Sequence, residues 1–311
     1  MENTQQTQPQ PKVETQSRRE VTIKSLLETG AHFGTNTGMW NPKMAPFIFG
    51  IRRGKGAGNS IYIINLESTI KMWKKARQAI VDNICNGGEL LFVSTKSNLK
   101  ELVSTEASLV SSPYVDVKWL GGTLTNLDVI KKEVKRLDKL EDMLKRIESP
   151  TCELNLKKKE VVVMQKEVAK LVKSLNGIRK LKKPPTMMFI TDVHKNKLAL
   201  AEAKRLKIPV VALVDTNVDP TTVDFPIPAN DDSNSSQALF LRCVADAVAE
   251  GQAILRSKKE ADIQAEELKA GPPVEDTAVV VKSNIQLKDL EGLLNPKQDR
   301  NIKVSHKKAK A

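Results

Sequence analysis

Short apolar runs that alternate with helical patterns constrain the fold of this chain more than any other feature. The strand-like runs cover residues 61–66, 89–95, 114–120, 186–192 and 208–215. The helical patterns cover residues 67–86, 97–109, 194–206 and 233–256. Nearly continuous aliphatic runs separated by helices are typical of strands buried on both faces of a parallel sheet. The pattern predicts an α/β fold, a doubly wound parallel sheet of three layers with right-handed crossovers.

Residues 128–176 interrupt this alternation with two long helical patterns. In both arms the apolar residues recur at steps of three and four, and each narrow apolar seam is flanked by charge. Such seams are typical of the a and d positions of a coiled coil. A short turn-like segment separates the arms, and Gly177 suits a helix end. We expect an antiparallel coiled-coil hairpin inserted into a discontinuous α/β domain of residues 20–127 and 177–256.

The two ends of the chain differ in composition from this central part. Residues 1–19 are rich in Gln, Thr and Pro, so they cannot bury enough apolar surface to offset the entropy lost on ordering. We expect this tail to be disordered. From residue 257 to residue 311 the chain is charged and has no long apolar segment. We expect a mostly flexible tail that ends in a basic cluster.

Targeting signals and cysteine frameworks are missing from the sequence. The N-terminus has no apolar core of a secretory signal, and no apolar run approaches the ~20 residues of a membrane-spanning helix. Cys85, Cys152 and Cys243 stand far apart, without the spacing of a zinc site or a disulfide framework. These features predict a cytoplasmic protein with no membrane partner.

The charge of the chain is large and unevenly distributed. The 311 residues carry a formal net charge of +13, which suits an anionic partner, most often nucleic acid. Residues 128–183 contribute +8 of this, whereas residues 184–256 carry −2. A coiled coil whose surface contacts only solvent usually carries similar numbers of positive and negative side chains. The excess therefore favours contact with a polyanion, although solvation remains the alternative for any single lysine.

The glycine-rich stretch before the first apolar run does not match a nucleotide-binding loop. A P-loop requires four residues between its glycines and a hydroxyl after its lysine. Here three residues separate Gly50 from Gly54, and Gly56 follows Lys55. The glycines at 54, 56 and 58 also lack dinucleotide-loop spacing and lead into a strand rather than a helix. The stretch is either a flexible connection or a contact with a polyanion.

One strand end leaves an enzymatic alternative open. Asp215, Thr216 and Asn217 follow an apolar run, at the edge where parallel sheets bind ligands. With Asn230 and Asp232 they could hold a cation or a ribose, or they could form Asx turns and cap the next helix. No residue pair for proton transfer accompanies them. We predict no catalytic residue, no metal and no cofactor, with a small-molecule-binding α/β enzyme as the alternative.

Several fragments occur along the chain in one order between about Val21 and Gln252. They are GAHFGTNTGMWNPKMAPFIFGIR, IYIINLESTI, LLFVSTK, KWLGGTLTN, the expected hairpin, and IPVVALVDTNVDPTTVDFPIPANDD. The ordered set resembles the universal small-subunit ribosomal protein two family, in its bacterial or organellar form. The chain departs from the family at Thr35, Asn36 and Lys118, where bacterial members often carry histidine, glutamine and arginine. The run GKGAGNS looks like a short insertion.

The resemblance implies a structural constituent of the small ribosomal subunit that supports translation and has no catalytic activity. It implies a doubly wound α/β domain with a coiled-coil hairpin. The implied partners are ribosomal RNA, neighbouring ribosomal proteins and the large multi-domain protein that recruits messenger RNA. No homo-oligomer is expected.

The predicted RNA-binding residues are cations, because neutralising phosphates drives much of the binding and fixes orientation. They are Lys43, Arg52, Arg53, Lys55, Lys96, Lys118, Lys131, Lys132, Lys135 and Arg136. Trp40 and Trp119 are candidates for stacking on bases. For Trp119, packing in the protein core is the alternative.

Overall fold

The computed structural model describes residues 20–54, 60–148 and 158–270. Contacts divide the chain into two units, residues 1–261 and 262–311. The predictions for the N-terminal tail, Lys55, the turn of the hairpin with Cys152, and the C-terminal tail beyond residue 270 lie outside the described residues.

Five strands form a parallel sheet in the order β5-β4-β6-β7-β8. They are β4 (Leu90–Val93), β5 (Tyr114–Val115), β6 (Met187–Ile190), β7 (Val210–Val214) and β8 (Phe225–Pro228). The first four lie within predicted runs. The sequence did not predict β8 because two of its four residues are prolines, which cannot donate ladder hydrogen bonds. β8 is an edge strand, where proline is tolerated.

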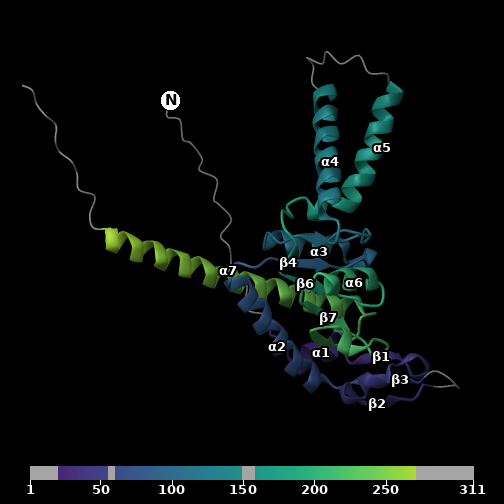
Figure 1. Cartoon of the computed structure of the whole chain (residues 1–311). Helices are drawn as coiled ribbons and strands as arrows, with labels where there is room; N and C mark the ends of the chain where they lie inside the picture. The colour runs from purple at the N-terminus through teal and green to yellow at the C-terminus, as the bar shows by residue number, and fades with distance from the viewer. Residues whose placement is uncertain (1–19, 55–59, 149–157, 271–311) are drawn as a thin grey trace, which may run out of the picture. The chain divides into compact units, whose positions relative to one another are not determined.

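Helices cover both faces of this sheet (Figure 1). On one face, Phe92 and Phe189 pack with side chains of α2 (Leu66–Cys85), α3 (Lys100–Leu109) and α7 (Asn234–Ala270). On the other face, Leu91 and Met188 pack with side chains of α6 (Lys197–Arg205) and of the sheet-proximal ends of α4 (Leu127–Glu148) and α5 (Lys158–Leu175). The α/β class predicted from the sequence is confirmed.

The first predicted strand does not join the parallel sheet, so that part of the prediction is wrong. Residues Ile61–Ile64 form β3, the central strand of an antiparallel sheet ordered β1-β3-β2. Its neighbours are β1 (Phe33–Asn36) and β2 (Ile48–Arg52). Only eight residues separate β2 from β3. That link can close an antiparallel pair, whereas a parallel crossover needs about a dozen residues or more.

Helix α7 continues well past the boundary that we predicted at residue 257. It ends at Ala270, immediately before a Gly-Pro pair. Lys, Glu, Ala and Gln dominate the added segment, and these residues favour helix even without an apolar stripe. The charged composition that suggested a flexible tail is therefore compatible with a helix up to the proline.

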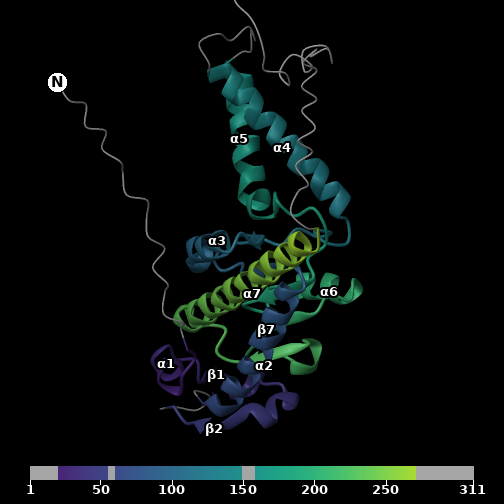
Figure 2. The same cartoon turned by 90° about the vertical axis from the view of Figure 1, so that its left-hand side faces the viewer.

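Helices α4 and α5 occupy the two arms predicted for the hairpin and lie side by side in both views (Figures 1 and 2). Arg136 of α4 pairs with Glu167 of α5. Near the parallel sheet, Leu137 and Leu175 are fully buried, at 0% and 1% exposure, in the core that covers the sheet. The base of the two helices is therefore part of the domain core.

Gly177 is required by a close approach rather than by the helix end that the sequence suggested. A Cβ atom at this position would lie 2.1 Å from the carbonyl oxygen of Tyr114 and 2.7 Å from its ring. The φ angle of Gly177 is not positive, so it does not form the left-handed cap. Replacing Gly177 by alanine forces the backbone of β5 away.

We expect the Gly177→Ala variant to lose about 1–3 kcal/mol of unfolding free energy, measured by urea denaturation. Gly50→Ala is the matched control, because no atom lies within 4 Å of the Cβ that it would add. Equal stability of the two variants would contradict the close approach to Tyr114.

Candidate nucleic-acid interface

The strand end that offered an enzymatic alternative is covered by another part of the chain. Asp215 and Thr216 follow β7 and are buried, at 1% and 0% exposure. Thr35 of β1 donates its backbone N–H to the Thr216 hydroxyl at 2.9 Å, and the two threonine hydroxyls lie 2.6 Å apart. A Cβ atom on Gly34 would lie 2.6 Å from the Thr216 methyl group. A substrate could reach Asp215 and Thr216 here only by displacing β1.

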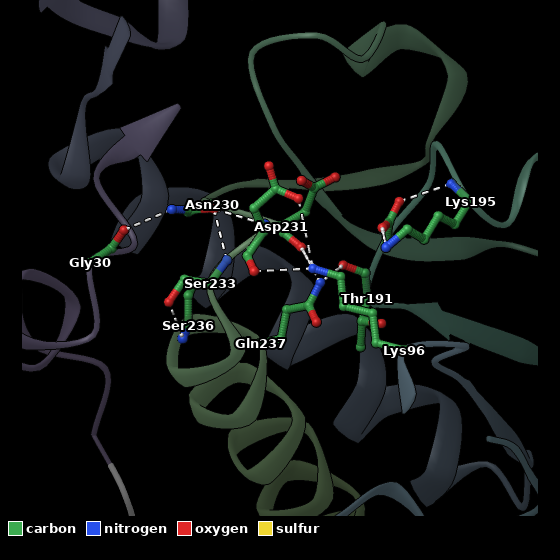
Figure 3. A network of polar contacts seen from close by, with 11 residues as sticks. Gly30, Lys96, Thr191, Lys195, Asn230, Asp231, Ser233, Ser236 and Gln237 are labelled. Carbon is green, nitrogen blue, oxygen red and sulfur yellow. Dashed lines mark hydrogen bonds and ion pairs between the residues drawn. The ribbon is translucent and has the colours of Figure 1, made fainter. Parts of the chain in front are cut away.

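The second polar turn caps a helix, which is one of the two roles considered for it. The side-chain oxygen of Asn230 accepts the backbone N–H groups of Asp232 and Ser233 at 2.8 and 3.0 Å. The Ser233 hydroxyl accepts the backbone N–H of Ser236 at 3.4 Å, at the start of α7. Asn230 also donates its side-chain N–H to the Gly30 carbonyl at 3.1 Å (Figure 3). The turn joins α7 to the segment that follows α1 (Ile23–Glu28).

The crevice between the carboxyl ends of β4 and β6, where the strand order reverses, is occupied by protein side chains (Figure 3). Open parallel sheets often bind ligands at this point. Here the Lys96 ammonium donates to the backbone carbonyls of Asp231 and Asp232 at 2.6 and 3.1 Å, and the side chain is only 11% exposed. Gln237 donates to the carbonyls of Asp231 and Thr191. This geometry argues against the predicted contact of Lys96 with RNA.

Several carboxyl groups gather around this crevice and change its electrostatics. Burial, followed by the carboxylates of Asp215, Asp192 and Asp232, raises the pKa of Asp231 to about 8, against the opposing charge of Lys96. Burial also raises the pKa of Asp215. Within the described residues, no group of three or more His, Cys, Asp or Glu side chains is arranged to hold a metal ion.

Trp119 lies inside the protein, which favours packing in the core, the alternative considered for it, over stacking on RNA bases. Its side chain is 6% exposed, and its ring N–H donates to a carboxylate oxygen of Glu202 at 2.9 Å. The Glu202 carboxylate also accepts the backbone N–H groups of Gly122 and Leu124 at 2.8 and 2.9 Å. Glu202 therefore holds the loop that leads into α4. Sequence reasoning missed Glu202, although it occupies the buried stripe of α6.

Three of the predicted RNA-binding cations lie on or beside the three-stranded sheet. Lys43 is paired with Asp219 at 2.6 Å, and hydrogen bonds from Lys43 and from the hydroxyl and backbone N–H of Thr221 lower the pKa of Asp219 to about 2. The Arg52 guanidinium lies 5.5 Å from the centre of the Phe33 ring. Arg52 and Arg53 are exposed, and neither forms an ion pair within the described residues. Unlike Lys43, these two guanidinium groups have no acidic partner within the described residues.

An apolar groove and a half-exposed tryptophan accompany these cations. Trp40 is half-buried, with its ring centre 5.0 Å from that of Tyr62. The groove has a volume of about 320 Å³. Phe49, Leu27 and Ile23, which line it, are 79%, 50% and 49% exposed. Clustered exposed apolar side chains are typical of protein contacts. Sequence reasoning missed this groove because it joins α1 to the later strands β2 and β3.

The remaining predicted cations lie elsewhere. Lys118 is exposed in the loop before α4, and Lys132 and Lys135 are exposed on α4. Lys131 lies 3.6 Å from Asp128, and Arg136 is paired with Glu167. The three-stranded sheet and α4 lie at opposite ends of the view in Figure 1, with the parallel sheet between them. The structure therefore separates the predicted cations into at least two surfaces.

None of the helices that the structure describes has the length and apolar content required to cross a bilayer.

Comparison with known proteins places these features in a family. The family model described as ribosomal protein S2 matches residues 26–251. A "small ribosomal subunit protein uS2" from Nitratidesulfovibrio vulgaris is 43% identical over 253 residues, which cover 81% of this chain and 96% of the relative. Proteins of the same name from Maridesulfovibrio salexigens and Mycobacteroides abscessus are 44% and 45% identical, covering 83% and 74% of this chain and 95% and 80% of the relatives.

Proposed function

The chain belongs to the ribosomal protein S2 family, and on this basis we propose that it is a structural constituent of the small ribosomal subunit that supports translation on cytoplasmic ribosomes. The observation that carries the proposal is the family match, which includes both sheets, α4 and α5. The cover that β1 forms over Asp215 and Thr216 favours a structural role over an enzymatic one.

We further propose that the protein binds ribosomal RNA through two basic surfaces. The sheet surface comprises Arg52 and Arg53, with Trp40 available to stack on a base. The hairpin surface comprises the exposed predicted cations of α4, which are Lys132, Lys135 and Arg136. We propose that α4 is one arm of an antiparallel coiled coil, inserted into a three-layered, doubly wound domain. Contacts with phosphates at both surfaces would orient the protein rather than read sequence.

Protein partners belong to the same proposal. The groove beside Phe49 offers an exposed apolar surface of the kind that neighbouring proteins cover. The partners that we propose are adjacent ribosomal proteins of the small subunit, including the large multi-domain protein that recruits messenger RNA.

The proposed sheet surface is tested by replacing Arg52 and Arg53 together with alanine. We expect an almost unchanged melting temperature, because surface substitutions usually alter stability by less than ~0.5 kcal/mol. Binding to small subunits that lack this protein should weaken, most strongly at low salt. Each lost phosphate contact should reduce the slope of log affinity against log salt by about 0.7–0.9. Co-sedimentation across a salt titration gives both values.

The matched control replaces two adjacent lysines of α2, Lys74 and Lys75, with alanine. Both are exposed and neither is a predicted RNA contact, so the variant loses the same charge from another surface. If the arginine variant and this control give parallel salt titrations, Arg52 and Arg53 do not contact phosphates.

A further inference from the structure

A second groove lies at the base of α4, where the chain leaves α5. It has a volume of about 410 Å³. Its apolar lining comes from five side chains, Leu127, Ile130, Val134, Ile178 and Leu181. All of these except Val134 are less than 10% exposed, so they form a firm floor in the folded protein. A groove of about 410 Å³ has room for one or two apolar side chains of a partner.

The rim of this groove is strongly basic. Lys131, Lys135, Arg179 and Lys182 line it, with Asp138 as the single acidic lining residue. Arg179 is already paired with Glu141 at 2.6 Å and lies 3.6 Å from Asp138. Lys135 and Lys182 are exposed and form no ion pair within the described residues. These two ammonium groups are free to receive carboxylates.

The charge excess of the hairpin segment is concentrated near this groove rather than at the tip. Of the net +8 of residues 128–183, half comes from Arg179, Lys180, Lys182 and Lys183. Residues 139–164, which include the distal parts of both arms, contribute only +1. A partner attracted by this field is therefore guided to the base of the helices.

We propose that this groove binds a short acidic segment of a partner protein, which inserts one or two apolar side chains between the lysines of the rim. The apolar side chains fill the floor, and the carboxylates pair with Lys135 and Lys182. Buried anchors supply most of the affinity at such contacts, and complementary charge supplies rate and specificity. An RNA strand would satisfy the lysines but would place polar sugar and phosphate against the apolar floor.

This inference assigns Lys135, which the hairpin surface proposed above would offer to RNA, to a protein contact instead, and it does not depend on the sheet surface of Arg52 and Arg53. Binding of a peptide to the groove needs no ribosomal subunit, whereas the sheet surface is tested by subunit binding with the Arg52 and Arg53 variant. Failure of one proposal is therefore distinguishable from failure of the other.

The test selects twelve-residue peptides from a displayed random library on the full-length protein. We expect the selected peptides to combine several Asp or Glu residues with at least one large apolar residue. Their affinity is then measured for the charge-reversed groove variant, Lys135→Glu with Lys182→Glu. The matched control, Lys132→Glu with Lys139→Glu, changes the net charge equally at exposed positions of α4 outside the groove lining. We expect a loss of at least ten-fold in the groove variant and less than three-fold in the control.

Three outcomes would overturn the proposal. The first is that no selected peptide depends on the groove lysines. The second is that both charge-reversed variants weaken peptide binding equally. The net charge of the protein would then attract the peptides without a defined binding site. The third is that peptides with serine in place of their apolar residues bind as tightly. If instead a single-stranded oligouridine loses ten-fold in affinity for the groove variant alone, while the peptides do not, the groove is an RNA site.

Discussion

Replacing Glu202 by alanine is expected to lower the unfolding free energy by about 3–5 kcal/mol, because several buried donors lose their acceptor together. The carboxylate accepts the ring N–H of Trp119 and the backbone N–H groups of Gly122, Leu124 and Thr125, at 2.8 to 3.2 Å. An alanine side chain reaches none of them. Urea denaturation of the full chain measures the loss.

Two further variants separate this effect from a change of surface charge. Glu202→Gln keeps the volume but turns an N–H donor toward other donors, so we expect an intermediate loss. Glu28→Ala removes an exposed carboxylate and should alter stability by less than ~0.5 kcal/mol. If Glu202→Ala costs no more than Glu28→Ala, the loop before α4 does not depend on this carboxylate.

The pH dependence of the same effect has a defined sign. Burial raises the pKa of Glu202, but the hydrogen bonds from Trp119 and from the backbone of Leu124, Gly122 and Thr125 outweigh it, so the pKa is lowered. A carboxyl with a lowered folded pKa stabilises the protein above its unfolded pKa of about 4.3. This contribution is lost as the pH falls through the folded pKa. The difference between wild type and Glu202→Ala should therefore shrink in acid.

The sequence predicted those parts of the fold that its local pattern determines. The strands β4, β6 and β7 are nearly continuous apolar runs because both of their faces are buried. The strands β1 and β2 were missed because their pairing with β3 gives them mixed burial and no regular apolar alternation.

The direction of individual side chains was harder to predict. Lys96 enters the crevice because its ammonium donates hydrogen bonds to the carbonyl groups of Asp231 and Asp232, about 135 residues later in the chain. Trp119 turns inward because Glu202 accepts its N–H. A basic or aromatic residue read alone gives no sign of such distant partners. Glu202 offered the stronger signal, since a carboxylate on the buried stripe of a helix requires donors.

Asp231→Asn is expected to stabilise the protein at pH 8 by about 2 kcal/mol or more. Burial and then the carboxylates of Asp215, Asp192 and Asp232 raise the pKa of Asp231 to about 8, with Lys96 acting in the opposite direction. Asparagine has nearly the same shape and never ionises. Each unit of pKa shift corresponds to about 1.36 kcal/mol, and we expect only part of the full shift to appear because Asp215 and Asp231 interact.

The sign of this effect is opposite to that of Glu202. A carboxyl whose folded pKa is raised stabilises the protein fully below its unfolded pKa of about 3.9, and this contribution is lost as the pH rises through about 8. The advantage of Asp231→Asn over wild type should therefore grow from about pH 5 to about pH 8, as measured by urea denaturation at each pH.

Asp232→Asn is the matched control for this prediction. Its side chain lies in the same turn but is 79% exposed, and its carboxylate is the smallest of the three charges that raise the pKa of Asp231, so its replacement should change the pH profile much less than Asp231→Asn does. The Lys96 ammonium donates to the backbone carbonyls of both residues, and those contacts survive either substitution. A loss of stability in Asp231→Asn at pH 8 would mean that the network needs an ionised carboxylate at this position. Lys96, whose ammonium already lies 3.8 Å from the Asp232 carboxylate, would then act as the counter-ion of Asp231 as well.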